Sequence, residues 1–366
     1  MSKSETQAAV CYEFGSPLVV EKLFLDDPGD EEVRVELKAC AICHSDIALL
    51  RGEWAGVRTP TVAGHEAAGV VEATGDAVDS VSAGDHVVVT LVRSCGQCTA
   101  CRAGHTVCCS GTTLLDGESR LTNSAGQRVE QGLNTGAFAD ACVVHQSQLV
   151  RIPDDISFVS AALLGCGVIS GFCSVTNVAK IEPGSKVVVI GTGGLGLNTI
   201  QGAALSGASP IIAVDVLDNK LQAAREFGAT HTINALHDPA VAEVTRICND
   251  GGADYAFVTV GKSAAFSQSI EMLCKYGTTV IVGMPPDDDR TFSVDSHLLT
   301  TGRKVLGSKL GDTCIRDDIP NLISLYQKGQ LKLDELVSDT YLLNDINHAI
   351  EIAERGEALR NVIVFD

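Results

Sequence analysis

The stretch KVVVIGTGGLGLNTIQGAALSGA, residues 186–208, decides the fold of the second half of the chain. A short apolar run, typical of a strand buried on both faces, leads into a glycine-rich turn and then a helical pattern. Such a turn lets a pyrophosphate approach bare backbone at a helix N-terminus, where N–H donors and the helix dipole favour an anion. The stretch therefore predicts a dinucleotide-binding loop. Its predicted residues are Gly191, Gly193, Gly194, Leu195 and Gly196.

A carboxylate follows this loop at the spacing that dinucleotide sites use. The run PIIAVD ends in Asp215, 19 residues beyond Gly196. A carboxylate at the tip of the second strand accepts hydrogen bonds from the adenosine ribose and repels a 2′-phosphate, which favours NAD over NADP. A helix cap is the alternative role of Asp215. Lys220 is also expected near the ribose, with a solvated lysine on a helix face as the alternative.

The rest of the chain divides by the period of its apolar residues. Before about residue 165, stretches such as EEVRVELKA and AAGVVEATG alternate with period two, which predicts a small, barrel-like all-β domain. From residue 186, apolar strands alternate with helical stretches such as NKLQAAREFGA and SAAFSQSIEMLCKYG, which predicts a parallel, doubly wound α/β sheet. The terminal RNVIVFD is predicted to be a strand that rejoins the first domain.

Length, charge and hydropathy exclude several classes of protein. The chain has 366 residues, which suits two domains, and 45% of them are apolar, enough for a sizeable core. Its formal net charge of −19 argues against nucleic-acid binding, which needs clustered Lys and Arg. No apolar run reaches the roughly 18 residues of a membrane span, and the N-terminus lacks a signal-peptide core. We therefore expect a cytoplasmic protein with no nucleic-acid or membrane partner.

Five of the fourteen cysteines fall within one short loop. Cys95, Cys98, Cys101 and Cys109 have the spacing C-x2-C-x2-C-x7-C, and four thiolates can close the tetrahedral shell of a structural zinc site. An iron–sulfur cluster is the main alternative, but its run would end in Cys-Pro where this sequence reads HT. The spacing therefore predicts structural zinc, with Cys108 as an alternative fourth ligand.

Three further residues predict a second, open metal site. Cys43 lies in KACAICHSDIALL, residues 38–50, where a strand pattern meets a helix pattern and a helix N-terminus favours the thiolate. His65 lies in VAGHEAAG, and Cys166 lies in LLGCGVISG. Two cysteines and a histidine, with water in the fourth position, are typical of a catalytic zinc site.

The ordered motifs CHSD, GHEAAG, C-x2-C-x2-C-x7-C, GCG and GTGGLG resemble those of the zinc-dependent medium-chain alcohol dehydrogenases. The likeness runs from about residue 8 to the C-terminus and is closest to the long form that includes the animal, plant and class III enzymes. It implies a GroES-like β-barrel catalytic domain, residues 1–167 completed by 310–366, and an inserted Rossmann NAD-binding domain, residues 168–309. It also implies an active site between the domains, two zinc ions per chain, NAD and a homodimer.

The resemblance assigns roles around the predicted catalytic zinc. Cys43, His65 and Cys166 would hold the ion, and Glu66 would lie behind it. Asp46 would accept the spare N–H of His65, which fixes the tautomer of the ring and its basicity as a ligand. A surface aspartate in a salt bridge is the alternative for Asp46.

The resemblance also implies the coenzyme and substrate contacts. His44 and Arg360 would contact the coenzyme pyrophosphate. Apolar residues would line the substrate pocket, although positions in the core are the alternative for them. These predicted pocket residues are Trp54, Leu91 and Phe138.

The implied reaction is reversible hydride transfer between a primary or secondary alcohol and NAD. Ser45 would hydrogen-bond the substrate oxygen and carry the proton away. Many relatives pass this proton to a histidine near the start of the helix, but here the matching residue is Ala48. We therefore hypothesise that the proton leaves through water or another group.

Two alternative functions stay within the enzymes of this family. A dehydrogenase of thiol adducts of formaldehyde would need a basic pocket wall, for which Arg51 and Arg58 give ambiguous support. A second group of relatives holds the nicotinamide permanently and acts as dismutases. A non-catalytic structural or binding protein is a third alternative, against which the zinc ligands and Ser45 argue.

Overall fold

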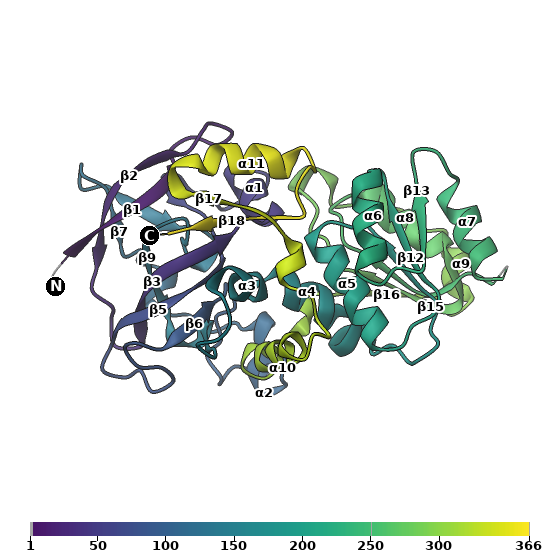
Figure 1. Ribbon diagram of the computed structural model, residues 1–366, viewed down its shortest axis with the longest axis horizontal. Helices are drawn as coiled ribbons and strands as arrows, with labels where there is room; N and C mark the ends of the chain where they lie inside the picture. Colours follow the sequence, from purple (N-terminus) through teal and green to yellow (C-terminus); the bar gives the residue numbers. More distant parts are fainter. Residues whose placement is uncertain (1–2, 250, 366) are drawn as a thin grey trace. The chain divides into compact units, whose positions relative to one another are not determined.

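The computed structural model describes residues 3–249 and 251–365, which divide into two compact units (Figure 1). The first unit contains the chain as far as Cys166, together with Cys314–Asn321 and the segment from Leu333 onward. The second unit contains Gly167–Thr313 and Leu322–Lys332.

The first unit contains a closed β-barrel and a mixed sheet. The barrel order is β1–β2–β7–β8–β4, and the sheet order is β10–β6–β5–β3–β18–β17, with β9 also paired to β3. The barrel strands are β1 (Lys3–Cys11), β2 (Val19–Asp26), β4 (Thr61–Val62), β7 (Leu121–Thr122) and β8 (Arg128–Gln131). The sheet strands are β3 (Glu32–Ala41), β5 (Glu66–Thr74), β6 (His86–Val89), β9 (Ala141–His145), β10 (Leu149–Arg151), β17 (Val337–Leu342) and β18 (Arg360–Val364).

Strand β3 forms as its alternating pattern predicts. Val33, Val35 and Leu37 are buried, and the polar residues between them are partly exposed. Strand β18, formed by the residues RNVIV of the predicted stretch, pairs antiparallel with β3, and Figure 1 shows this yellow strand beside the purple β3. Asp366, the last residue of that stretch, lies outside the described residues. The predicted return of the C-terminus to the first domain is therefore confirmed. The helices of this unit are α1 (His44–Leu50), α2 (Thr99–Arg102), α3 (Phe158–Ala162) and α11 (Ile346–Glu354).

The second unit is the parallel, doubly wound sheet that the sequence predicts. Its order is β13–β12–β11–β14–β15–β16, and every pairing is parallel. Helices α5 and α6 pack together, and so do α7 and α8. Right-handed crossovers require this grouping, because the chain builds the sheet outward from β11 in one direction and from β14 in the other. The strands are β11 (Val187–Ile190), β12 (Ile211–Asp215), β13 (His231–Asn234), β14 (Ala253–Val258), β15 (Leu273–Ile281) and β16 (Lys304–Gly307). The helices are α4 (Gly167–Cys173), α5 (Gly194–Leu205), α6 (Asp218–Glu226), α7 (Ala240–Ile247), α8 (Ser263–Glu271) and α9 (Ser296–Thr300).

One predicted helix is too long. The stretch SAAFSQSIEMLCKYG was expected to be helical throughout, but α8 ends at Glu271 and β15 begins at Leu273. Leu273 pairs with Ala253 in the parallel sheet, and Tyr276 has a positive φ of 65° that a helix does not allow. Sheet pairing therefore overrides the helical propensity of these residues.

The segment Leu322–Lys332 includes the end of α10 (Ile315–Gln327) and belongs to the second unit, whereas the sequence analysis placed it with the first domain. Its last residue explains this difference. The backbone N–H of Lys332 donates to Oε1 of Gln201 at 2.8 Å, and Nε2 of Gln201 donates to the carbonyl of Lys332 at 3.1 Å. The ammonium of Lys332 also donates to the carbonyl of Glu226.

Among the described residues, no single helix is long and apolar enough to cross a membrane; the bent pair Phe158–Gly165 and Gly167–Ala179 passes that test only when both helices are taken together.

Candidate active site

Cys43, His65, Glu66 and Cys166 lie together in the first unit. One potential ligand atom from each of them lies within 4.8 Å of the others. Cys43 is the N-cap of α1 just after β3, His65 and Glu66 stand at the start of β5, and Cys166 follows α3 in the chain. Antiparallel pairing of β3 with β5, in which Ala41 lies opposite Glu66, brings the first two segments together.

Asp46 links two of these residues through a fully buried carboxylate. Its Oδ1 lies 2.8 Å from Nδ1 of His65 and accepts the N–H of Gly64 at 2.8 Å, while Oδ2 accepts the N–H of Cys43 at 3.1 Å. The expected contact with His65 is therefore present, and the alternative of a surface position is wrong. Because the carboxylate favours the hydrogen on Nδ1, Nε2 of His65 offers its lone pair to the cluster.

The donor set of the cluster fits a zinc ion. Among the described residues, Nε2 of His65 and Oε1 of Glu66 are buried and have no hydrogen-bond partner. A hydrogen bond with Cys166 lowers the pKa of Cys43 well below its usual value against the effect of burial, and His65 adds to this lowering. Thiolate sulfur and imidazole nitrogen are the ligands that zinc prefers.

Glu66 forms a buried ion pair with Arg360 of β18. Nη2 of Arg360 lies 2.5 Å from Oε2 of Glu66. Burial raises the pKa of Glu66 to about 8, although Arg360 opposes the shift. The sequence does not indicate this pair, because no local pattern links residues 294 positions apart. The contact of Arg360 with the coenzyme stays a prediction.

The four cysteines of the predicted structural site also come together, with their sulfur atoms within 4.8 Å of one another. Backbone N–H groups of the loop point at these atoms: that of Cys101 donates to Sγ of Cys98 at 3.4 Å, and that of Cys98 donates to Sγ of Cys95 at 3.3 Å. The hydrogen bond from Cys101 is the main reason that the pKa of Cys98 falls to about 5. These donors favour thiolates, so the loop fits structural zinc. Cys108 is exposed and lies outside the cluster.

The glycine loop has the predicted place between β11 and α5. Gly191 has a φ of +90°, and a Cβ on Gly196 would lie 1.9 Å from the carbonyl oxygen of Gly191. By contrast, a Cβ on Gly193, the N-cap of α5, would meet no atom within 4 Å. Open space before the free N–H groups of a helix N-terminus fits the pyrophosphate of NAD.

Asp215 ends β12 and is hydrogen-bonded to the glycine loop. Its Oδ2 accepts the backbone N–H of Thr192 at 2.6 Å and the hydroxyl of Thr192 at 3.0 Å. Thr192 was not among the predicted site residues, although it lies inside the GTGGLG motif. The ribose contact of Asp215 stays a prediction. Lys220 is only 6% exposed, so the alternative of a solvated lysine is wrong.

The other predicted site residues lie in the first unit. His44 is exposed at the start of α1, and Ser45 is half-buried in its first turn. Trp54 and Leu91 are half-buried. Phe138 is fully buried in the core cluster that includes the barrel strands, which favours the alternative of a core position. The coenzyme and substrate contacts of these residues stay predictions.

Comparison with known proteins matches both parts of the chain. Residues 29–154 match the model of the alcohol dehydrogenase GroES-like domain, and residues 194–328 match that of the zinc-binding dehydrogenases. An S-(hydroxymethyl)glutathione dehydrogenase of Paracoccus denitrificans is 35% identical over 98% of this chain and 100% of its own length. An NDMA-dependent alcohol dehydrogenase of Amycolatopsis methanolica is 36% identical over 98% of this chain and 99% of its own.

Solved structures agree with these matches. Benzyl alcohol dehydrogenase of Acinetobacter calcoaceticus superposes with a TM-score of 0.91 and 31% identity, covering 99% of this chain and 100% of its own. An alcohol dehydrogenase zinc-binding domain protein of Burkholderia ambifaria superposes with a TM-score of 0.94 and 32% identity, covering 100% of each chain.

Gly111 provides a test of the cysteine loop. A Cβ at this position would lie 2.6 Å from Cβ and Sγ of Cys95. We expect Gly111→Ala to lower the zinc content by one ion per chain and to lower Tm, because the cysteines can no longer close around the ion. Atomic absorption and thermal melting measure this. Gly117→Ala is the control, since the nearest atom to its Cβ would be 3.9 Å away. Unchanged zinc content and Tm in Gly111→Ala would contradict the assignment.

Gly193 and Gly196 separate coenzyme binding from folding. Gly196→Ala forces a carbon against the carbonyl of Gly191, so we expect a lower Tm. Gly193→Ala meets no protein atom and should keep the wild-type Tm, but its methyl group occupies the space before the helix N-terminus. We expect its Kd for NAD to rise about ten-fold or more, a loss of about 1.4 kcal/mol by calorimetry. Equal NAD affinity in Gly193→Ala and the wild type would rule out the predicted loop contact.

Proposed function

The chain belongs to the zinc-dependent medium-chain alcohol dehydrogenases, and from this we propose that it transfers hydride reversibly between a primary or secondary alcohol and NAD. One observation carries the proposal most directly. The cluster of Cys43, His65 and Cys166 holds a buried histidine nitrogen that has no partner among the described residues and whose tautomer Asp46 sets. This is the donor set of a catalytic zinc site that keeps one position open.

The side chains divide the chemistry between them. Cys43, His65 and Cys166 would hold a zinc ion, which would act as a Lewis acid and lower the pKa of the substrate hydroxyl. NAD, positioned by the protein, would supply the hydride acceptor. Ser45 lies two residues after Cys43 in the same first turn of α1. Its hydroxyl accepts the hydrogen bond of the alcohol and passes a proton onward.

The proton route beyond Ser45 differs from the one that the resemblance implies for many relatives. Ala48 lies three residues after Ser45, on the same face of α1, and it carries no titratable group. We propose that water takes the proton at this step.

Neutral alcohols fit the surroundings of the site better than anionic thiol adducts do. Arg51, one of the two cations near the predicted pocket segment, already pairs with Glu354 at 2.7 Å and lies 3.6 Å from Glu53. Its charge is therefore compensated before a substrate carboxylate arrives. Oxidation of thiol adducts, as the name of the Paracoccus relative indicates for that enzyme, is the second candidate, and exposed Arg58 is the cation that favours it.

We also propose a cytoplasmic homodimer. Six of the fourteen cysteines lie in the two metal clusters, and thiolate ligands persist in a reducing compartment. Strand β16 is one of the two edges of the parallel sheet, and all four of its residues are exposed, including Val305 and Leu306. An edge strand with apolar residues supports pairing with a second copy.

A panel of alcohols and aldehydes, including a hydroxymethyl-thiol adduct, tests the activity with NAD. We expect two zinc ions per chain and NAD-dependent oxidation of neutral alcohols. Ser45→Ala should lower kcat about 10²-fold or more, because the alcohol loses its proton acceptor. Ser45→Thr retains the hydroxyl and serves as the control. A wild-type chain with fewer than two zinc ions and no activity on the panel would overturn the proposal, and nucleotide retained after purification would identify a permanently held coenzyme.

Ala48→His should add a titratable step to proton release. The new imidazole ionises near its usual pKa of about 6.5, so we expect a new inflection in the pH profile of kcat/KM in that region. Ala48→Gln, of similar size but without a titratable group, should show no such inflection. If the two variants have the same profile as the wild type, the proton does not pass this position.

A further inference from the structure

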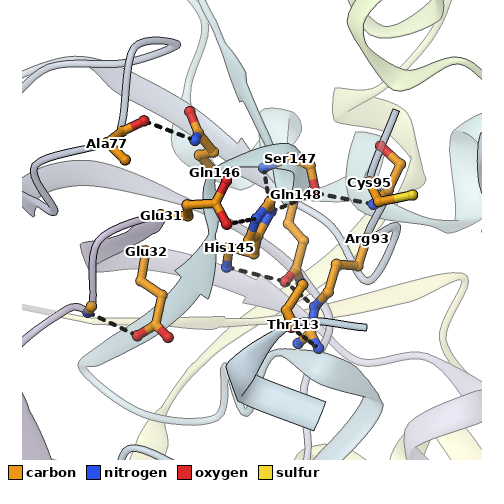
Figure 2. A network of polar contacts seen from close by, with 12 residues as sticks. Glu31, Glu32, Ala77, Arg93, Cys95, Thr113, His145, Gln146, Ser147 and Gln148 are labelled. Atoms are coloured by element: carbon orange, nitrogen blue, oxygen red, sulfur yellow. Dashed lines mark hydrogen bonds and ion pairs between the residues drawn. The ribbon is translucent and has the colours of Figure 1, made fainter. Parts of the chain in front are cut away.

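A polar network lies beside the cysteine loop, on the turn that follows β9 (Figure 2). His145, Ser147 and Gln148 form its centre, and all three are buried. No motif in the sequence pointed to them. Figure 2 shows Gln148 facing Arg93 and Ser147 facing the segment of Cys95, whereas the ring of His145 faces Glu31 and Gln146 points toward Ala77.

Gln148 uses both ends of its amide to join three segments. It is fully buried. Its Oε1 accepts the backbone N–H of His145 at 3.2 Å and Nε–H of Arg93 at 3.0 Å. Its Nε2 donates to the carbonyl of Thr90 at 2.9 Å and to that of Asn134 at 3.1 Å. The set contains two donors to Oε1 and two acceptors from Nε2, which is the full capacity of a side-chain amide.

The bond to Asn134 holds a strained turn. Leu133 and Asn134 both have positive φ angles, 51° and 64°, which side-chain-bearing residues rarely adopt. Such turns persist when the surrounding contacts impose them. The guanidinium of Arg93 also donates to the carbonyl of Asn134 at 3.4 Å. Gln148 and Arg93 together therefore fix the position of this turn.

The turn leads directly to the metal cluster. Thr135 follows Asn134 and is fully buried, and its hydroxyl donates to the carbonyl of Gly64 at 2.7 Å. The N–H of Gly64 donates to the same Oδ1 of Asp46 that contacts Nδ1 of His65. Gly64 and His65 are adjacent, so the position of the turn bears on the histidine ligand.

The other side of the network holds the cysteine loop. The guanidinium of Arg93 donates to Oγ1 of Thr113 at 3.0 Å and to Oδ1 of Asp116 at 2.6 Å, just beyond the loop. The hydroxyl of Ser147 accepts the N–H of Ser94 at 3.0 Å, directly before Cys95. Both ends of the cysteine loop are thus fastened to the residues around Gln148.

We propose that Gln148 is a positioning residue for the His65 metal site and that it ties this site to the cysteine loop. Through Asn134 and Thr135 it holds the carbonyl of Gly64, and through Arg93 it holds the loop that carries the four cysteines. It touches no predicted ligand. The proposal rests on the proposed function, since it assumes that Cys43, His65 and Cys166 bind zinc.

Gln148→Glu tests the proposal with almost no change of shape. The new carboxylate oxygen faces the carbonyls of Thr90 and Asn134, so two hydrogen bonds become contacts between acceptors. A chelator in excess is added to the intact zinc-loaded protein, and metal release and loss of activity are followed together. The phase of zinc release that coincides with the loss of activity is assigned to the His65 site. We expect this phase to be about ten-fold faster in Gln148→Glu, the range seen when groups that orient metal ligands are removed.

Gln146→Glu is the matched control. It lies two residues away in the same turn, and its amide bonds the carbonyl of Ala77, the N–H of Asp79 and the hydroxyl of Ser80 instead. Its release rates should equal those of the wild type. Thr135→Val removes the hydroxyl that donates to the carbonyl of Gly64 and leaves that carbonyl with the N–H of Ala137 alone. It should also accelerate release, whereas Thr135→Ser should retain the wild-type rate. These two variants test the proposal even if Gln148→Glu does not fold.

The outcomes separate the two proposals. Wild-type release rates in both Gln148→Glu and Thr135→Val, or equal acceleration in Gln146→Glu, would overturn the positioning role while leaving the enzyme assignment intact. A lower Tm without faster release would reduce Gln148 to a structural residue and also overturns the proposal. A wild-type chain without two zinc ions would instead overturn the proposed function, and the positioning role with it.

Discussion

The carboxylate of Asp46 is the interaction on which the metal cluster depends. A buried charge is costly unless hydrogen bonds compensate it, and this one has three neighbouring N–H donors. One donor is the N–H of Cys43, the N-cap of α1, and the other two belong to Gly64 and His65, directly before β5. The same side chain therefore holds a helix end and a histidine ring together. Because the three donors come from two segments and satisfy one ion, displacing either segment leaves the charge only partly compensated.

Charge balance behind the cluster comes from the far end of the chain. Glu66 brings a second carboxylate into the buried region, and Arg360 lies against it. Arg360 reaches this place because β18 pairs with β3, with Val362 opposite Ala41. The final strand therefore completes the electrostatics of a site whose other residues come from the first half of the chain. A fold in which the C-terminus did not return to the sheet would leave Glu66 without its counter-ion.

Much of this arrangement could be predicted, but for different physical reasons. The cysteine loop and the glycine loop are local, so spacing alone indicates their chemistry. Cys43, His65 and Cys166 are far apart, and only the resemblance connected them before the structure did. The predicted end of α8 was wrong, because the pairing of β15 depends on the sheet and not on the local sequence. Nothing in the sequence indicates a role for Gln148, because its role depends on four hydrogen-bond partners that only the folded structure brings together.

The two metal clusters differ in how much chain they enclose. The cysteine loop spans 14 residues from its first to its last ligand, whereas the other set spans 123 residues from Cys43 to Cys166. Closing the longer segment in an unfolded chain costs about 2 kcal/mol more in loop entropy, before any strand pairing is counted. The cysteine loop also supplies its own backbone donors to the sulfur atoms. Its ligands and these donors lie within one short segment, whereas the ligands of the His65 site come together only when β3, β5 and the segment after α3 have assembled. The two sites therefore differ in how much of the fold must form before their ligands can meet.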